Sequence, residues 1–183
     1  TSFGQVLIIY FLLALLYTYG LKKIIYLDLI ILTSFYIIRI FSGGVAIDAV
    51  VTGWLIIFSF FLFLSLAAIK RITEIQKYSD SDLRKMGKSY TSSNLDNLYA
   101  LTKLSQLIAL VMLSLYILIA ASDLYSKNFY LIPSVIIFYL WFSRIISITK
   151  NNTMRDDPII FAISDPVTYL SFFSIVAVFI LAA

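Results

Sequence analysis

The chain of 183 residues contains no cysteine and no histidine. Without cysteine it can form no structural disulfide, no thiol nucleophile and no thiolate metal ligand. Without histidine it offers no imidazole acid or base, which excludes Ser-His-Asp triads and zinc hydrolase sites built from these residues alone. Any bound metal would therefore be held by oxygen ligands, a preference that favours magnesium.

Charge is also scarce, because only 13% of the residues are charged and 61% are hydrophobic. A soluble fold of this length could not bury so much apolar surface in one core, so we expect an integral membrane protein. A transmembrane helix needs about 20 mostly apolar residues. Six windows approach or meet this length and predict an all-α, multi-pass bundle of six transmembrane helices, namely 4–19, 24–41, 50–69, 98–121, 130–149 and 166–183.

The basic residues divide unevenly between the two sides of these windows. Ten of the 14 Lys and Arg residues fall in connections on one side, whereas the connections on the other side contain only Lys127. The positive-inside rule then places the basic side in the cytoplasm. We expect one transmembrane domain over residues 1–183, with a cytoplasmic active-site loop over 70–97. Arg39 lies inside a window, and it should either snorkel to the outer interface or face a pocket or a neighbouring helix.

The start of the 70–97 segment concentrates polar side chains on one face, provided that the third window continues as helix. Lys70, Arg71 and Glu74 then share an arc with Lys77 and Tyr78. Lysine and arginine can neutralise a phosphate, and Glu74, the only glutamate of the chain, can hold magnesium. We interpret Lys70 and Glu74 as candidate catalytic residues, Arg71 as substrate-binding and Glu74 as the candidate metal ligand. The alternative is an ordinary solvated helix end with Arg71 paired to Glu74.

A second polar run, Gly87-Lys88-Ser89-Tyr90, joins a flexible glycine to a cation and two hydroxyl groups. Such a run can bind phosphate through backbone N–H groups and side-chain donors. It would also serve as a surface loop attracted to anionic lipid. Asp157 and Asp165 each precede a proline, which is typical of helix starts. Asp156 has no such role and is a candidate acid above the cytoplasmic cavity.

Four short patches carry a resemblance that covers most of the chain. They are Tyr19-Gly20-Leu21-Lys22 with Asp28, Tyr36-Ile37-Ile38-Arg39 with Gly43-Gly44-Val45-Ala46, Lys70-Arg71 with Glu74, and Ser89-Tyr90-Thr91-Ser92 followed by an acidic pair before Asp165 and Val167. In order and spacing they resemble the UbiA-type superfamily of membrane prenyltransferases. Within it they are most similar to the branch of decaprenyl-phosphate phosphoribosyltransferases.

The resemblance implies a nine-helix fold around a central cavity, of which this chain is similar to helices four to nine. The chain opens with Thr1, and we expect it to be part of a longer protein and inactive alone. The superfamily has two Asp-rich motifs for magnesium and diphosphate, and the first is not among these residues. At the second, prenyl-transferring members have two carboxylates four residues apart, whereas the matching positions here are Lys70 and Glu74. That departure resembles the phosphoribosyl-transferring branch.

The implied reaction is magnesium-dependent transfer of a 5-phosphoribosyl group from phosphoribosyl diphosphate to a polyprenyl phosphate at the cytoplasmic face of the cell membrane. No nucleic acid partner is implied. Positions that match phosphate contacts are Lys22 or Lys23, Lys70, Arg71, Glu74, Gly87, Lys88 and Ser89. One alternative is a prenyltransferase that moves the lipid onto an aromatic acceptor, and another is a non-catalytic membrane subunit or transporter.

Overall fold

The computed structural model describes residues 2–125, 127–154 and 157–183, which fold into helices joined by short connections. Six long helices form the body of the protein: α1 (Ser2–Tyr19), α2 (Leu27–Ala46), α3 (Gly53–Lys77), α5 (Leu95–Ile119), α6 (Ile132–Lys150) and α8 (Pro166–Ala182). Two short helices, α4 (Asp80–Lys85) and α7 (Pro158–Ser164), lie in connections. No β-strand occurs among the described residues, as expected for an all-α fold.

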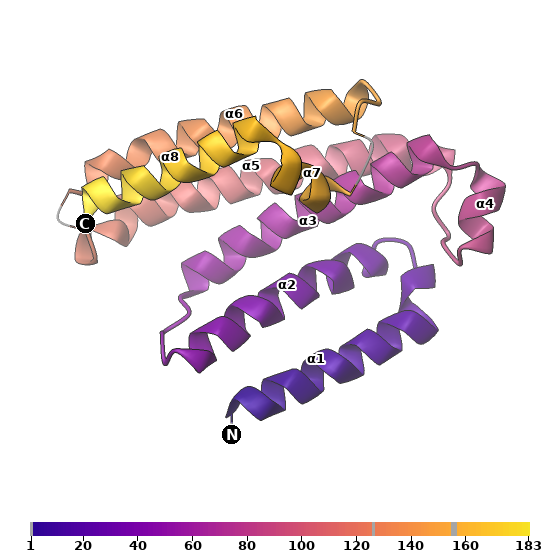
Figure 1. Ribbon diagram of the computed structural model, residues 1–183, viewed down its shortest axis with the longest axis horizontal. Coiled ribbons are helices and arrows are strands. Elements are labelled where there is room, and N and C mark those ends of the chain that lie inside the picture. The colour runs from indigo at the N-terminus through magenta and orange to yellow at the C-terminus, as the bar shows by residue number, and fades with distance from the viewer. Residues whose placement is uncertain (1, 126, 155–156) are drawn as a thin grey trace.

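The long helices pack as neighbours in chain order (Figure 1), and the pair α3 and α5 has the most extensive contact. Buried small residues on both helices, among them Ala67 and Ala68 on α3 and Ala109 on α5, leave little side-chain bulk between helices. The connections that follow α1, α3 and α6 gather at one end of the bundle, which we call the basic end. Both chain termini lie toward the opposite end (Figure 1).

Four helices are long and apolar enough to cross a membrane: Leu27–Ala46, Gly53–Lys77, Ser92–Ile119 and Asn128–Lys150. The windows 4–19 and 166–183 form the shorter apolar helices Phe3–Tyr19 and Pro166–Ala182, so the count of six spans stays a prediction. The outward surface is apolar, with Phe11 62%, Leu118 74% and Leu170 68% exposed, as suits lipid rather than water. The expectation of an apolar, membrane-type helical bundle is confirmed.

The predicted loop over 70–97 is largely ordered into helices. Helix α3 continues to Lys77, as the polar face required, and α4 follows after Ser79, whose side chain accepts a hydrogen bond from the backbone N–H of Asp82. Gly87 then reverses the chain with a φ of +75°, a conformation that favours glycine. Leu83 and Tyr90 insert into the core beneath α3, so the segment folds back over the basic end.

Candidate active site

A buried arginine joins three helices at the basic end. Arg71 on α3 is 3% exposed, and its Nε and Nη2 donate to the two carboxylate oxygens of Asp28 on α2 at 2.6 and 2.8 Å. The hydroxyl of Tyr17 on α1 donates to Asp28 at 2.8 Å and accepts from Arg71 at 3.2 Å. Bidentate geometry and full burial make this the polar anchor that fixes α1, α2 and α3 to one another.

Glu74 extends this anchor toward the surface. Its carboxylate accepts a hydrogen bond from Nη1 of Arg71, one helical turn earlier, and lies 2.7 Å from Nζ of Lys88. Charges therefore alternate from Asp28 in the core, through Arg71 and Glu74, to Lys88. The pairing of Arg71 with Glu74 is confirmed, but the two side chains are only 4% and 17% exposed, so the pair is not part of an ordinary solvated helix end.

A polar cavity of about 280 Å³ opens beside this row of charges. Lys70, Glu74 and Lys88, all predicted site residues, line it, and Lys70 forms an ion pair with Asp157 at the start of α7. The other residues that line the cavity are Thr73, Lys77, Tyr78 and Met86. Three lysines and two carboxylates thus surround one space, an arrangement suited to a phosphate-bearing ligand.

Lys22 lies at the edge of the same region, next to the turn at Gly87. A Cβ atom built on Gly87 would lie 3.6 Å from Cε and 3.9 Å from Nζ of Lys22. Among the described residues, no carboxylate forms an ion pair with Lys22 or with the exposed Lys23. The backbone carbonyl of Lys23 accepts a hydrogen bond from the Ser89 hydroxyl. Of the two lysines that the sequence left as alternatives, Lys22 is the one beside Gly87.

Tyr90 lies underneath the charges rather than in the cavity. It is 1% exposed, its ring centre lies 5.9 Å from the Arg71 guanidinium, and its hydroxyl accepts from the backbone N–H of Tyr26 at 2.9 Å. Burial raises the pKa of Tyr90 to about 12, so the phenol is neutral near pH 7. Neither Tyr90 nor Arg71 lines the cavity, and contact between either residue and a substrate stays a prediction.

Sequence reasoning gave no role to Asp28 and read Asp157 only as a helix start. A lone carboxylate in an apolar window is itself a signal, since it needs a polar partner inside the membrane. The reading of Asp165 as a helix cap is confirmed, because its carboxylate accepts from the Thr168 backbone N–H at 2.8 Å. The same carboxylate also accepts hydrogen bonds from Nη1 and Nη2 of Arg144 at 2.7 and 2.8 Å. Asp156 lies outside the described residues.

The acidic residues described at the site are too few to hold a magnesium ion by themselves. Nowhere in the described part of the chain do three acidic groups gather where they could hold a metal ion. Glu74 already pairs with the cations Arg71 and Lys88, which makes it a poor single ligand. These residues do not form a magnesium site by themselves, so Glu74 as a metal ligand stays a prediction.

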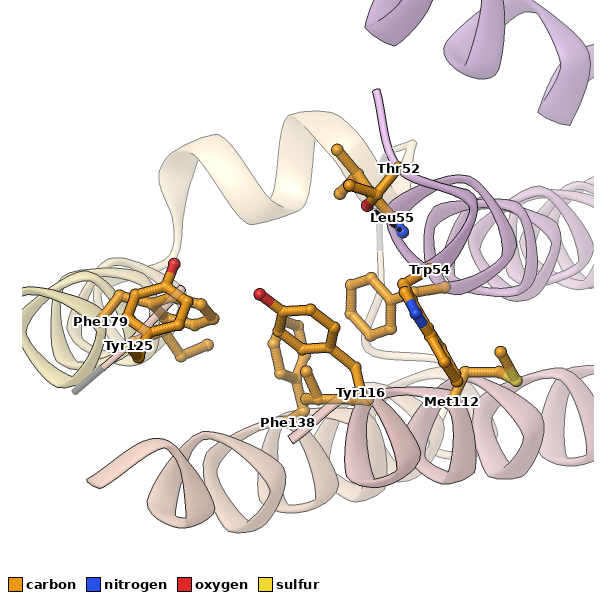
Figure 2. Close-up of a pocket in the computed structure, with 11 residues that line it drawn as sticks. Thr52, Trp54, Leu55, Met112, Tyr116, Tyr125, Phe138 and Phe179 are labelled. Carbon is orange, nitrogen blue, oxygen red and sulfur yellow. Dashed lines mark hydrogen bonds between the residues drawn. The ribbon is translucent and has the colours of Figure 1, made fainter. Parts of the chain in front are cut away.

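A second cavity, of about 350 Å³, lies at the other end of the bundle. Trp54 and Phe58 of α3, Tyr116 of α5 and Phe138 of α6 contribute rings to it. Figure 2 shows Tyr125 and Phe179 across the space from Tyr116 and Phe138. None of the residues that line this cavity is charged. It is therefore suited to apolar groups, whereas the cavity at the basic end is suited to anions.

No family model matches the chain. The uncharacterized protein y4nM of Sinorhizobium fredii is 27% identical over 184 residues, which cover 99% of this chain and 36% of y4nM. Decaprenyl-phosphate phosphoribosyltransferase of Mycolicibacterium smegmatis is 36% identical over 99 residues, covering 53% of this chain and 31% of that enzyme. The enzyme of that name from Mycobacterium tuberculosis is 29% identical over 103 residues, covering 55% of this chain and 34% of the relative.

The chain thus spans about a third of the length of the curated relatives it matches. The matches to the two phosphoribosyltransferases are partial and of moderate identity. Together with the apolar helices, they support a UbiA-like relationship.

Proposed function

We propose that the full-length protein transfers a 5-phosphoribosyl group from phosphoribosyl diphosphate to a polyprenyl phosphate. The observation that carries this proposal is the cavity at the basic end, where Lys70 and Lys88 line one space and are each held by a carboxylate. Both substrates carry phosphate, which lysine ammonium groups bind well. The names of the matched mycobacterial relatives support the same class of reaction.

In the proposed reaction, an oxygen of the lipid phosphate forms a bond to C1 of the ribose while the bond from C1 to diphosphate breaks. The bonding electrons leave with diphosphate, so the leaving group gains negative charge. The lipid phosphate is already ionised near pH 7 and needs no general base, consistent with a chain that lacks histidine. Lys70 and Lys88 are the groups proposed to stabilise the leaving diphosphate.

The carboxylates would act by holding these lysines in place. Asp157 pairs with Lys70, and Glu74 lies 2.7 Å from the Lys88 nitrogen. Ammonium groups oriented before the substrate binds cost little reorganisation in the transition state. A magnesium requirement remains part of the proposal, although the residues described here do not form a site for the ion and no step above depends on it.

We also propose that α1 and α8 cross the membrane, which would give six spans of a nine-helix fold. At 1.5 Å per residue these helices are about 27 and 26 Å long, close to the roughly 30 Å hydrocarbon core. The basic end would then face the cytoplasm of a cell membrane. Single cysteines at the exposed Ser81 and Ser122 should label from opposite sides of the membrane, and labelling from one side would contradict this topology. Ser126, the other position suggested by the sequence, lies outside the described residues.

Purified full-length protein in liposomes tests the function directly. Given labelled phosphoribosyl diphosphate, a polyprenyl phosphate and magnesium, we expect a labelled lipid and released diphosphate, and neither product when the lipid or the metal is left out. Transfer of a prenyl group from its diphosphate to an aromatic acid, without use of the phosphoribosyl donor, would contradict the proposal. Failure of both reactions would favour a non-catalytic subunit or transporter.

A further inference from the structure

Arg39 is a charged residue inside a membrane-type helix. It lies on α2 and is exposed, and among the described residues no carboxylate forms an ion pair with it. Its guanidinium donates a hydrogen bond from Nη2 to the Tyr10 hydroxyl at 3.0 Å and lies near the rings of Tyr10 and Tyr36. A cation in hydrocarbon is costly, so an arginine in this position needs a polar environment or an anionic ligand.

The side chain is directed toward the basic end. The Arg39 guanidinium lies 5.3 Å from the ring centre of Tyr36, which precedes it by three residues on α2. Helical side chains lean toward the helix N-terminus, and for α2 that terminus lies at the basic end. A snorkelling arginine this far along α2 would instead reach for the opposite interface. The structure therefore assigns Arg39 to a pocket or a neighbouring helix rather than to the outer interface.

Aromatic contacts connect Arg39 to the face of α3 that carries Lys70. Tyr36 stacks on Phe63 of α3, with ring centres 4.4 Å apart and planes 11° from parallel. Phe63 and Lys70 are seven residues apart on α3, which places them on nearly the same face, two turns or roughly 10 Å apart along the axis. The Tyr36 hydroxyl also lies within electrostatic range of Lys70, Asp157 and Arg39.

Arg39 differs from two other arginines of the long helices in what its donors contact. The guanidinium of Arg71 forms ion pairs with the carboxylates of Asp28 and Glu74, and that of Arg144 forms an ion pair with Asp165. Arg39 donates one hydrogen bond, to the neutral hydroxyl of Tyr10, although a guanidinium carries five N–H donors in a planar arrangement. A fork of this kind matches two oxygens of a phosphate. The two tyrosine rings limit its motion by cation–π contact.

We propose that Arg39, positioned by Tyr10 and Tyr36, binds a phosphate monoester beside the stacked rings of Tyr36 and Phe63. This inference rests on the proposed function, in which the sugar donor carries such a group at C5 and the lipid acceptor carries one at its head. Phe63 lies two turns, or roughly 10 Å along the axis of α3, before Lys70, so the Tyr36–Phe63 ring pair beside Arg39 marks a different level of the bundle from the lysines assigned to the diphosphate. Arg39 therefore serves a second phosphate, from one of these two substrates.

The test compares full-length wild type with Arg39→Met, which keeps most of the length and removes the charge. Two probes separate the sources of the phosphate: farnesyl phosphate for the lipid and ribose 5-phosphate for the sugar. We expect Arg39→Met to weaken the binding of one probe roughly ten- to a hundredfold, as for a lost charge-assisted contact, and to leave the other within about twofold. Arg39→Lys, which keeps the charge without the fork, should lose less and covers the case in which Arg39→Met does not fold.

Arg144→Met is the matched control, because the donors of Arg144 are already taken by Asp165. It should lower the melting temperature without changing the affinity for either probe. Equal affinity of wild type and both Arg39 variants for both probes, or no binding of either probe by wild type, would overturn the inference. Measuring the transfer rate separates the role of Arg39 from the proposed reaction. If wild type catalyses the transfer and the Arg39 variants bind both probes as wild type does, only the role of Arg39 is contradicted. Binding that depends on Arg39 without transfer contradicts only the proposed reaction.

Discussion

The two ends of α3 build cavities of similar size by different means. Near its end, Lys70 and Glu74 face a polar cavity of about 280 Å³, and near its start, Trp54 and Phe58 face an aromatic cavity of about 350 Å³. In the first, ion pairs fix the side chains in position, and in the second, ring packing does so. The difference implies that removing one charge should disturb the basic end far more than removing one ring disturbs the other.

The largest effect is expected from Asp28→Asn. The change leaves Arg71 buried without its bidentate partner, and breaking a buried pair from one side typically costs about 3–5 kcal/mol of folding stability. We expect the full-length variant to be recovered in low yield and to melt at a lower temperature. The matched control is Asp82→Asn, because the pair of Asp82 with Lys85 is exposed and 3.6 Å long. Equal melting of the two variants would show that the buried pair is not the anchor we describe.

Glu74→Gln should act on turnover rather than on folding. Arg71 keeps Asp28 in this variant, so we expect normal insertion, but Lys88 loses its charged partner and the cavity loses a carboxylate. Loss of one electrostatic contact in the transition state typically costs on the order of 3 kcal/mol, about a hundredfold in rate. The expected result is a transfer rate about a hundredfold lower. Near-wild-type turnover would assign Glu74 to structure alone.

These two positions show what sequence patterns could and could not predict. Helical periodicity predicted the shared face of Lys70, Arg71 and Glu74, on the assumption that α3 continues past the apolar window, because such a face depends on residues close in sequence. It could not supply partners from other helices, such as Asp28, 43 positions from Arg71, or Asp157, 87 positions from Lys70. Such pairs arise from tertiary packing, which periodicity does not encode. The aromatic cavity was missed for the same reason, since its rings come from four long helices and a connection.

Phe138→Ala tests the other side of the comparison. Its ring is half-buried and lines the aromatic cavity, so truncation enlarges the space and removes contacts with Phe58 and Phe142. Removing a well-buried phenylalanine costs about 3–5 kcal/mol, and for a half-buried ring we expect about 2 kcal/mol of folding stability. Turnover of the folded protein should not change, because the lysines lie at the other end. A loss of activity at unchanged stability would show that the two ends are coupled.

The smallest effect concerns acid stability at Asp165. Its two hydrogen bonds with the Arg144 guanidinium hold the pKa of this carboxyl below its ordinary value. A pKa lower in the folded than in the unfolded state gives stability that is present above the unfolded value, near pH 4, and is lost as pH falls through the folded value. Arg144 is one-third exposed, so the contribution should stay below about 1 kcal/mol. The melting temperature of wild type should therefore fall slightly more between pH 6 and pH 3 than that of Asp165→Asn, and parallel curves would show that the pair adds nothing that depends on charge.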